Sequence, residues 1–221
     1  MYLKEQFEAV KNQTIKPSEI WIWHNQFEDL KFDYPKDLNV LVHSSRNFKF
    51  SGRWALALLA KTDYVAMFDD DSIPGNKYME NVFNCMKTKP GLYVGVGVNS
   101  FPKKRRFGWV NANPDIKRVD FGGHAWVIKT DLIHWFWREP MFMWNNGEDI
   151  HLSYILQKYA NVNTYVSPHP ENDKKLWSSL KGSKYGGDKN AHCIVDKQHY
   201  KDRNKIISYY VSKGWKVFPK Y

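Results

Sequence analysis

Apolar residues recur with two different periods along the first hundred positions. From Tyr2 to about Asn12 they follow helical spacing, with Leu3, Phe7 and Val10 on one stripe. Short runs rich in β-branched and aromatic residues come next and predict strands. The predicted elements are a helix at 2–12, strands at 19–23 and 38–42, a helix at 52–61, a strand at 63–68, a helix at 76–87 and a strand at 92–98. This order predicts an α/β fold with a mostly parallel, twisted sheet and helices on both faces.

After Asn99 the pattern is less regular. A basic loop at 101–107 and a polar stretch precede a predicted strand at 122–128. The remaining predicted elements are a short helix at 130–135, a helix at 150–159, a strand at 162–166 and a helix at 196–213. Gly, Ser and Lys residues are frequent in the polar segment 171–190, which indicates a loop. We therefore expect one domain, 1–221, made of two halves that meet near Asn99.

Length and composition narrow the class of protein. A chain of 221 residues can bury a substantial core in one domain. No run of about 18 apolar residues occurs, so no membrane-spanning helix is expected. The first residues lack the pattern of a signal peptide. Two cysteines, Cys85 and Cys193, favour neither a disulfide framework nor a zinc site. These features predict a soluble protein of a reducing compartment, the cytoplasm.

The net charge of +10 is compatible with nucleic-acid binding. The only dense basic run is Lys103-Lys104-Arg105-Arg106, and the other basic residues are scattered. A basic surface also suits a nucleotide diphosphate or an anionic membrane face. Because a nucleic-acid-binding module would leave two acidic motifs unexplained, we expect no nucleic-acid partner.

The first acidic motif is Asp69-Asp70-Asp71, directly after the apolar run 63–68. Carboxylates at the end of a buried strand repel one another unless a cation joins them. Ligands bind at the carboxyl ends of strands in open α/β sheets. Oxygen ligands there suit Mn²⁺ or Mg²⁺, which in turn bind diphosphates. The alternative is that the aspartates only cap the helix that begins near Asn76.

The second acidic motif is Glu148-Asp149, which follows Gly147 where a helix is predicted to begin. A sugar hydroxyl is a poor nucleophile and needs a general base, a role that a carboxylate can fill. Acidic residues at a helix N-terminus are also favourable through the helix dipole alone.

The order of these motifs resembles that of GT-A-fold glycosyltransferases, nearest the family-2-like enzymes. The resemblance runs from about Leu3 to His169 and depends on the ordered set rather than on one motif. That set comprises the Asn12-Gln13-Thr14 stretch before the first strand, Arg53 at a helix start, the aspartate triplet, the strand with Gly122-Gly123, and Gly147-Glu148-Asp149. The triplet is also similar to that of exostosin-type domains, and the chain is similar to virus-encoded capsid glycosyltransferases.

The resemblance implies a single GT-A-like domain with three layers, α/β/α. Residues 1–99 would bind the nucleotide sugar, and residues 100–221 would bind the acceptor. The family normally has a strand before the first helix, and the end of that strand holds the base. Here Met1 already lies at the helix, so either the start is truncated or the base is held differently.

The resemblance also implies roles on the donor side. Asp71 would bind the metal, Mn²⁺ or Mg²⁺, while Asp69 would contact the donor ribose or the metal through water. Asp70 and Arg53 would lie near the donor nucleotide, although Arg53 also fits an ordinary surface position. Related enzymes often place a further histidine ligand where His169 stands. Its rival is His192, and a lone histidine is often structural instead.

Gly122-Gly123-His124 would allow close approach of the donor sugar, or would mark a β-bulge. On the acceptor side, Asp149 would be the general base and Glu148 would hydrogen-bond to the acceptor. Trp144 and Trp109 are candidates for stacking on a sugar, although most such residues belong to a core. Residues 174–184 would form either a lid over the donor or a solvated loop.

The function expected is therefore transfer of a sugar, a hexose or deoxyhexose, from a UDP- or GDP-sugar to a hydroxyl of a glycan or glycoprotein, with inversion at the anomeric carbon. The alternative enzyme class is a nucleotidyltransferase acting on sugar phosphates, but no glycine-rich phosphate loop follows the first strand. If the chain is virus-encoded, the expected location is the host cytoplasm.

Overall fold

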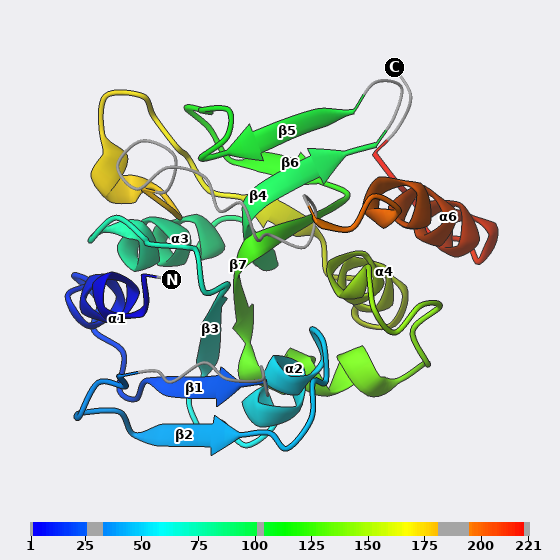
Figure 1. Cartoon of the computed structure of the whole chain (residues 1–221). Helices are drawn as coiled ribbons and strands as arrows, with labels where there is room; N and C mark the ends of the chain where they lie inside the picture. The colour runs from blue at the N-terminus through cyan, green and yellow to red at the C-terminus, as the bar shows by residue number, and fades with distance from the viewer. Residues whose placement is uncertain (1, 26–32, 101–103, 181–194, 219–221) are drawn as a thin grey trace.

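The computed structural model describes residues 2–25, 33–100, 104–180 and 195–218, and the structural statements below concern these residues. Its helices are α1 (Leu3–Lys11), α2 (Gly52–Ala57), α3 (Tyr78–Met86), α4 (Glu148–Ala160) and α6 (His199–Ser212), with 3₁₀ helices η1 (Thr130–Trp137) and η2 (Lys174–Leu176). Its strands are β1 (Trp21–His24), β2 (Val40–His43), β3 (Tyr64–Phe68), β4 (Leu92–Asn99), β5 (Arg105–Gly108), β6 (Lys117–Val119), β7 (Phe121–Lys129) and β8 (Thr164–Val166). Helices and strands thus alternate through much of the chain, as the apolar pattern predicted (Figure 1).

The main sheet has six strands in the order β3-β7-β4-β8-β6, and β5 also pairs with β4. The prediction of a mostly parallel sheet was wrong, because β4–β8 is the one parallel pair that the structure describes in it. For one of the antiparallel pairs the reason lies between β4 and β5, which only residues 100–104 connect. A parallel crossover needs about a dozen residues or more, so this short link forces an antiparallel pair. The basic loop predicted at 101–107 is accordingly a strand from Arg105 onward.

Helices cover both faces of this sheet, which gives the α/β layering that was expected. On one face, Val94 and Trp126 pack with apolar residues of α2, η1 and α4. On the other face, Tyr93 and Val127 pack against α3. Because neighbouring residues of β4 and β7 enter opposite clusters, both faces of these central strands are buried.

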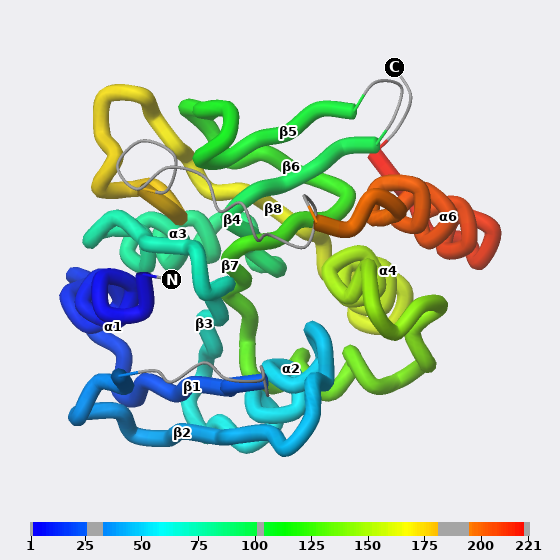
Figure 2. The backbone as a smooth tube through the Cα atoms, viewed as in Figure 1, coloured from blue at the N-terminus to red at the C-terminus, as the bar shows by residue number. Residues whose placement is uncertain are grey.

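A third apolar cluster joins α4 to α6, which Figure 2 shows side by side. Ile150 and Tyr154 of α4 meet Ile206 and Tyr210 of α6 there. The His151 imidazole, buried between them, accepts a hydrogen bond from the Tyr210 hydroxyl at 2.7 Å and donates one to the Phe136 carbonyl at 2.9 Å. The C-terminal helix is thereby fixed against the helix that carries the second acidic motif.

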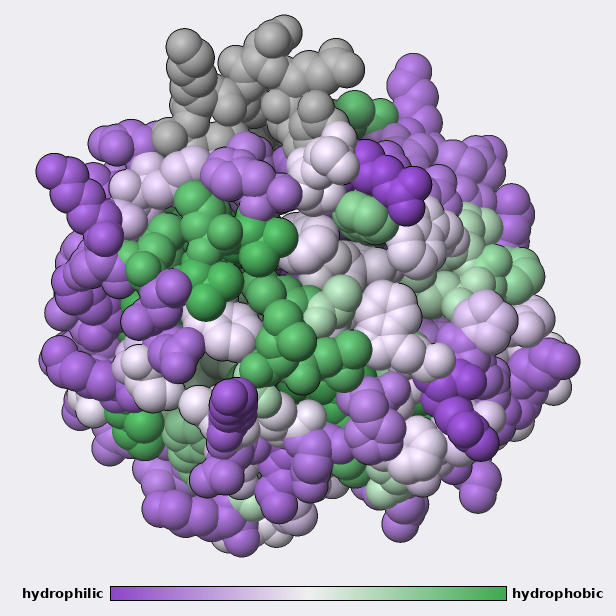
Figure 3. Space-filling model, turned by 90° about the horizontal axis from the view of Figure 1, so that it is seen from below, coloured by the Kyte–Doolittle hydropathy of each residue, from purple (hydrophilic) through white to green (hydrophobic). Residues whose placement is uncertain are grey.

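Strands β1 and β2 form a separate parallel pair that shares no ladder with the main sheet in the described ranges. Figure 3, which views the molecule from below, shows apolar side chains gathered toward the centre of that face, with hydrophilic residues around its border. Leu58 and Leu59, which follow α2, are both exposed. None of the helices in the described ranges has the length and apolar character needed to cross a lipid bilayer.

Candidate active site

Asp69, Asp71 and His124 form one polar cluster at the carboxyl end of β3. Each offers one ligand atom, and these atoms all lie within 4.8 Å of one another. Strand β7 brings His124 there, because its neighbour Ala125 pairs with Phe68, the last residue of β3. The Asp69 amide also donates to the His124 carbonyl at 2.9 Å. Two carboxylates and an imidazole can hold a divalent cation.

A β-bulge gives His124 its position. The β4–β7 register shifts between Val94 and Val96, and His124 adopts a left-handed φ of +69°. Bulges redirect side chains, and such strained residues concentrate at functional sites. Gly122 permits the close strand contact beside it, because a Cβ there would lie 2.2 Å from the Val96 carbonyl oxygen. The bulge interpretation of the glycine pair is therefore confirmed, while close approach of a donor sugar stays a prediction.

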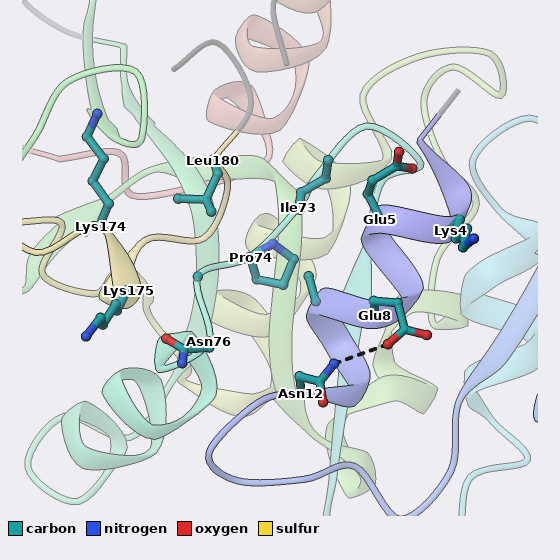
Figure 4. Close-up of a pocket in the computed structure, with 12 residues that line it drawn as sticks. Lys4, Glu5, Glu8, Asn12, Ile73, Pro74, Asn76, Lys174, Lys175 and Leu180 are labelled. Atoms are coloured by element: carbon teal, nitrogen blue, oxygen red, sulfur yellow. Dashed lines mark hydrogen bonds between the residues drawn. The ribbon is translucent and has the colours of Figure 1, made fainter. Parts of the chain in front are cut away.

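The loop after the triplet is held from two sides. The Gln6 side-chain amide donates to the Asp69 and Ser72 carbonyls at 2.5 and 2.7 Å. On the other side, the Leu180 amide donates to the Ile73 carbonyl at 2.7 Å. A groove of about 640 Å³ lies between α1, residues 73–76 and η2. Figure 4 shows the residues that line it. The metal-binding candidates do not line this groove, so it is separate from the polar cluster.

Arg53 connects the first acidic motif with the second. One guanidinium nitrogen bonds to the Asp69 carboxylate, and the other lies 3.5 Å from Glu148 Oε1. The guanidinium also stacks on Trp126, with 4.5 Å between Cζ and the ring centroid. Arg53 thus lies beside the aspartate triplet, while its predicted place near the donor nucleotide stays a prediction. The two acidic motifs, 77 positions apart from Asp71 to Glu148, meet in one site.

Glu148 and Asp149 occupy the first turn of α4 and are both buried. Asp149 also faces β7, because a Cβ added at Gly123 would lie 3.7 Å from Asp149 Oδ2. Burial and the neighbouring Asp149 raise the pKa of Glu148 to about 7, while Arg53 opposes the shift. Glu148 can therefore hold a proton near neutral pH, whereas an exposed glutamate would be ionised.

Asp149 is held by a residue that the sequence did not point to. The guanidinium of Arg203, on α6, bonds to both Asp149 oxygens, at 3.0 and 2.6 Å. Arg203 also lies over Phe121, 5.0 Å from the ring centroid. A bidentate arginine fixes the plane of a carboxylate. No local motif marks Arg203, because its partner lies 54 positions earlier and only the packing of α6 on α4 joins them.

His169 does not belong to the cluster of Asp69, Asp71 and His124, which corrects its predicted role as a metal ligand beside the two aspartates. It is fully buried, and its Nδ1 donates to the Ser167 carbonyl at 2.8 Å. Its Nε2 accepts from the Ser178 amide at 3.0 Å. Burial lowers the pKa of His169 to about 4, so the ring stays neutral and structural. His124 is the histidine that lies with Asp69 and Asp71, and the rival His192 lies outside the described residues.

The other predicted site residues differ in how closely they approach the cluster. Trp109 packs edge-on against His124, with ring centroids 5.3 Å apart. Asp70 is exposed and outside the three-residue group, although its charge reaches Arg53. Trp144 is 51% exposed on the segment before α4. Of the predicted lid, residues 174–180 are described, and the remainder lies outside the described ranges.

Gly147 sets the start of α4 and is a sensitive test of this arrangement. Its φ is +79°, and a Cβ there would lie 2.5 Å from Ile206 Cδ1. We expect Gly147→Ala to lower the free energy of unfolding by about 2–4 kcal/mol, from backbone strain and overpacking together. Gly214→Ala is the matched control, because Gly214 has φ +93° with nothing within 4 Å of such a Cβ. Urea unfolding of both variants measures the difference, and equal losses would contradict the predicted clash.

Comparison with models of protein families and with curated proteins finds no match to this chain.

Proposed function

We propose that this protein is a metal-dependent glycosyltransferase with a GT-A-like arrangement. It would transfer a sugar from a nucleotide-diphosphate donor to a hydroxyl of a glycan. One observation carries the proposal: Arg53 contacts both Asp69 and Glu148, so a candidate cation site and a candidate base site lie side by side. If the two acidic motifs served only to cap helices, they would have no reason to lie next to each other.

Asp69, Asp71 and His124 would hold the divalent cation. A set of two carboxylates and one imidazole suits Mn²⁺ better than Mg²⁺, which strongly prefers oxygen ligands. When bound, the cation would neutralise the diphosphate as it leaves, without a proton transfer. Arg53 would add a fixed positive charge on the same side. Asp70 and Gly123 would line the donor side, as the resemblance implies.

Asp149 would act as the general base on the acceptor side. Its carboxylate would take the proton of the acceptor hydroxyl while that oxygen attacks the anomeric carbon. The bond from the anomeric carbon to the diphosphate oxygen would break in the same step, with inversion. Arg203 would keep the carboxylate oriented, and Glu148 would hydrogen-bond to the acceptor. Trp109 and Trp144 would offer apolar faces to the sugar rings.

Product analysis tests the class of reaction. The chain is incubated with Mn²⁺ and a panel of UDP- and GDP-sugars, and the released nucleotide is identified by chromatography. We expect free nucleoside diphosphate, from transfer or slow hydrolysis, and none when EDTA removes the metal. Pyrophosphate would indicate a nucleotidyltransferase instead, and no metal-dependent product from any donor would contradict both enzyme classes.

The proposal includes a cytoplasmic location, or the host cytoplasm for a virus-encoded chain. Cys85, the cysteine that the structure describes, is buried with a free thiol. A free thiol of this kind is typical of a reducing compartment.

A further inference from the structure

Three cations surround the acceptor side of the site, and we call Lys104, Arg106 and Arg203 the basic rim. Arg203 bonds to Asp149. The Lys104 ammonium lies over the ring of Tyr200, 4.8 Å from its centroid. This contact joins the residue before β5 to the first turn of α6. Arg106 is exposed and lies opposite Val98 in the β4–β5 ladder. The rim thus combines residues from two elements that are distant in the sequence.

The positive charge of the rim exceeds what nearby acidic groups neutralise. Asp149 is already bonded to Arg203 through both oxygens. Across the residues with described positions, neither Lys104 nor Arg106 forms an ion pair. The pKa of Lys104 is lowered, first by burial and then by Arg106 and Arg203, with Asp149 opposing. Mutual repulsion of this kind is relieved when an anion binds between the cations.

The location of the rim assigns it to the acceptor rather than to the donor. Lys104 and Arg203 are close to Asp149, the proposed base, as the electrostatic coupling of the first and the hydrogen bond of the second indicate. Arg106 is close to Lys104, whose pKa it lowers, and lies opposite Val98, which packs in the same apolar cluster as α6. The donor side contains the acidic cluster of Asp69 and Asp71, with Arg53 bound to Asp69. A donor diphosphate would be neutralised there by the cation and Arg53, and would not require the rim.

We infer that the acceptor is an anionic glycan whose carboxylate or phosphate group binds between Lys104, Arg106 and Arg203, next to the hydroxyl that is glycosylated. This inference rests on the proposed function. A nucleic-acid strand fits less well, because its phosphates would follow an extended basic stripe with stacking platforms. Here Arg203 is bonded to the buried Asp149, next to the buried Glu148, and these carboxylates would repel a continuous phosphate backbone.

Equilibrium binding, followed by the fluorescence of the ten tryptophans, tests the inference without requiring turnover. The anionic probes are hexagalacturonate and a phosphorylated maltohexaose, and the neutral probes are the methyl ester of the first and unmodified maltohexaose. A twelve-nucleotide single-stranded DNA is the polyanion control. We expect at least one anionic probe to bind about tenfold more tightly than its neutral partner at low salt, with the preference largely lost at 0.5 M salt.

The variant pair sharpens the test. Lys104→Gln combined with Arg106→Gln should remove most of the tenfold preference. Arg105→Gln is the matched control, because it removes a charge from the same strand on the side opposite to Lys104 and Arg106. It should retain affinity within about twofold, as expected for one distant, screened surface charge. A site for carboxylates would prefer hexagalacturonate to its methyl ester, whereas a site for phosphates would prefer the phosphorylated maltohexaose to unmodified maltohexaose.

Equal affinity for the anionic and neutral probes would overturn the inference, and so would equal losses in the double variant and the control. DNA binding as tight as that of the anionic sugars would indicate a general polyanion surface and would also overturn it. Nucleotide-sugar hydrolysis, measured in parallel, separates the two proposals. Hydrolysis without a preference for anionic probes would overturn the role of the basic rim and leave the proposed transferase function standing. A preference for anionic probes without hydrolysis would support anion binding at the rim and overturn the transferase function.

Discussion

Replacing Asp149 with asparagine is expected to reduce sugar transfer by about 10²–10⁴-fold, the contribution typical of a positioned general base. Asparagine has the shape of aspartate and can still accept a hydrogen bond from Arg203, but it cannot take the acceptor proton. The affinity for a nucleoside diphosphate with Mn²⁺ should stay within about twofold, because the cation candidates lie on the other side of Arg53. Steady-state rates with saturating donor, combined with calorimetric binding of UDP or GDP, measure both quantities.

Glu148→Gln is the matched variant for this measurement. Both glutamine and protonated glutamate are neutral and can donate a hydrogen bond, and the pKa of Glu148 is already raised to about 7. This variant should therefore retain much more activity than Asp149→Asn. The opposite order of losses would assign the base to Glu148, and an unchanged rate in Asp149→Asn would remove Asp149 from the mechanism. Breaking a buried ion pair can cost about 3–5 kcal/mol, so a variant could lose activity by unfolding. The melting temperature of each variant shows whether it is still folded under the assay conditions.

Replacing Asp71 with asparagine is expected to abolish the stabilisation that Mn²⁺ and a nucleoside diphosphate give together. A ligand at 100 times its dissociation constant adds about 2.7 kcal/mol to the free energy of unfolding. For a chain of this size, that corresponds to a rise of roughly 5–10 °C in melting temperature. The variant removes one of the three ligand atoms within 4.8 Å, so its melting temperature should no longer rise. A thermal-melt series with and without Mn²⁺ and UDP or GDP measures the shift.

Asp70→Asn controls for the local loss of negative charge. Asp70 is adjacent in the sequence but exposed and outside the ligand group, so most of the shift should persist in this variant. A normal shift in Asp71→Asn would exclude Asp71 as a ligand. A shift lost equally in both variants would mean that the loop charge, rather than a specific ligand set, attracts the cation.

The local sequence predicted the order of most helices and strands because their burial is set by nearby residues. The run 63–68 and the helix at 76–87 correspond to β3 and α3, with ends that differ by one or two residues. The helix at 52–61 was predicted too long, since α2 ends at Ala57. Strand direction was predicted wrongly because the apolar pattern of a strand is the same in parallel and antiparallel pairs when both faces are buried.

The acidic motifs were identified from sequence because each places like charges at the end of an apolar element, where isolated carboxylates are costly. Their meeting through Arg53 is a contact that the geometry reveals. The histidine of the cluster was assigned to His169 on its place in the order of elements. Only the bulge in β7, a backbone conformation shared between two strands, directs His124 there instead.

By itself, the sequence determined the alternation of helices and strands and the two acidic motifs, because both depend on interactions between residues close along the chain. The tertiary structure alone decided strand direction, the position of His124 rather than His169 beside Asp69 and Asp71, and the pairing of Arg203 with Asp149. Each of these depends on contacts between residues that are distant in sequence. Such contacts form when whole elements pack, and no local pattern of apolar and polar positions encodes them.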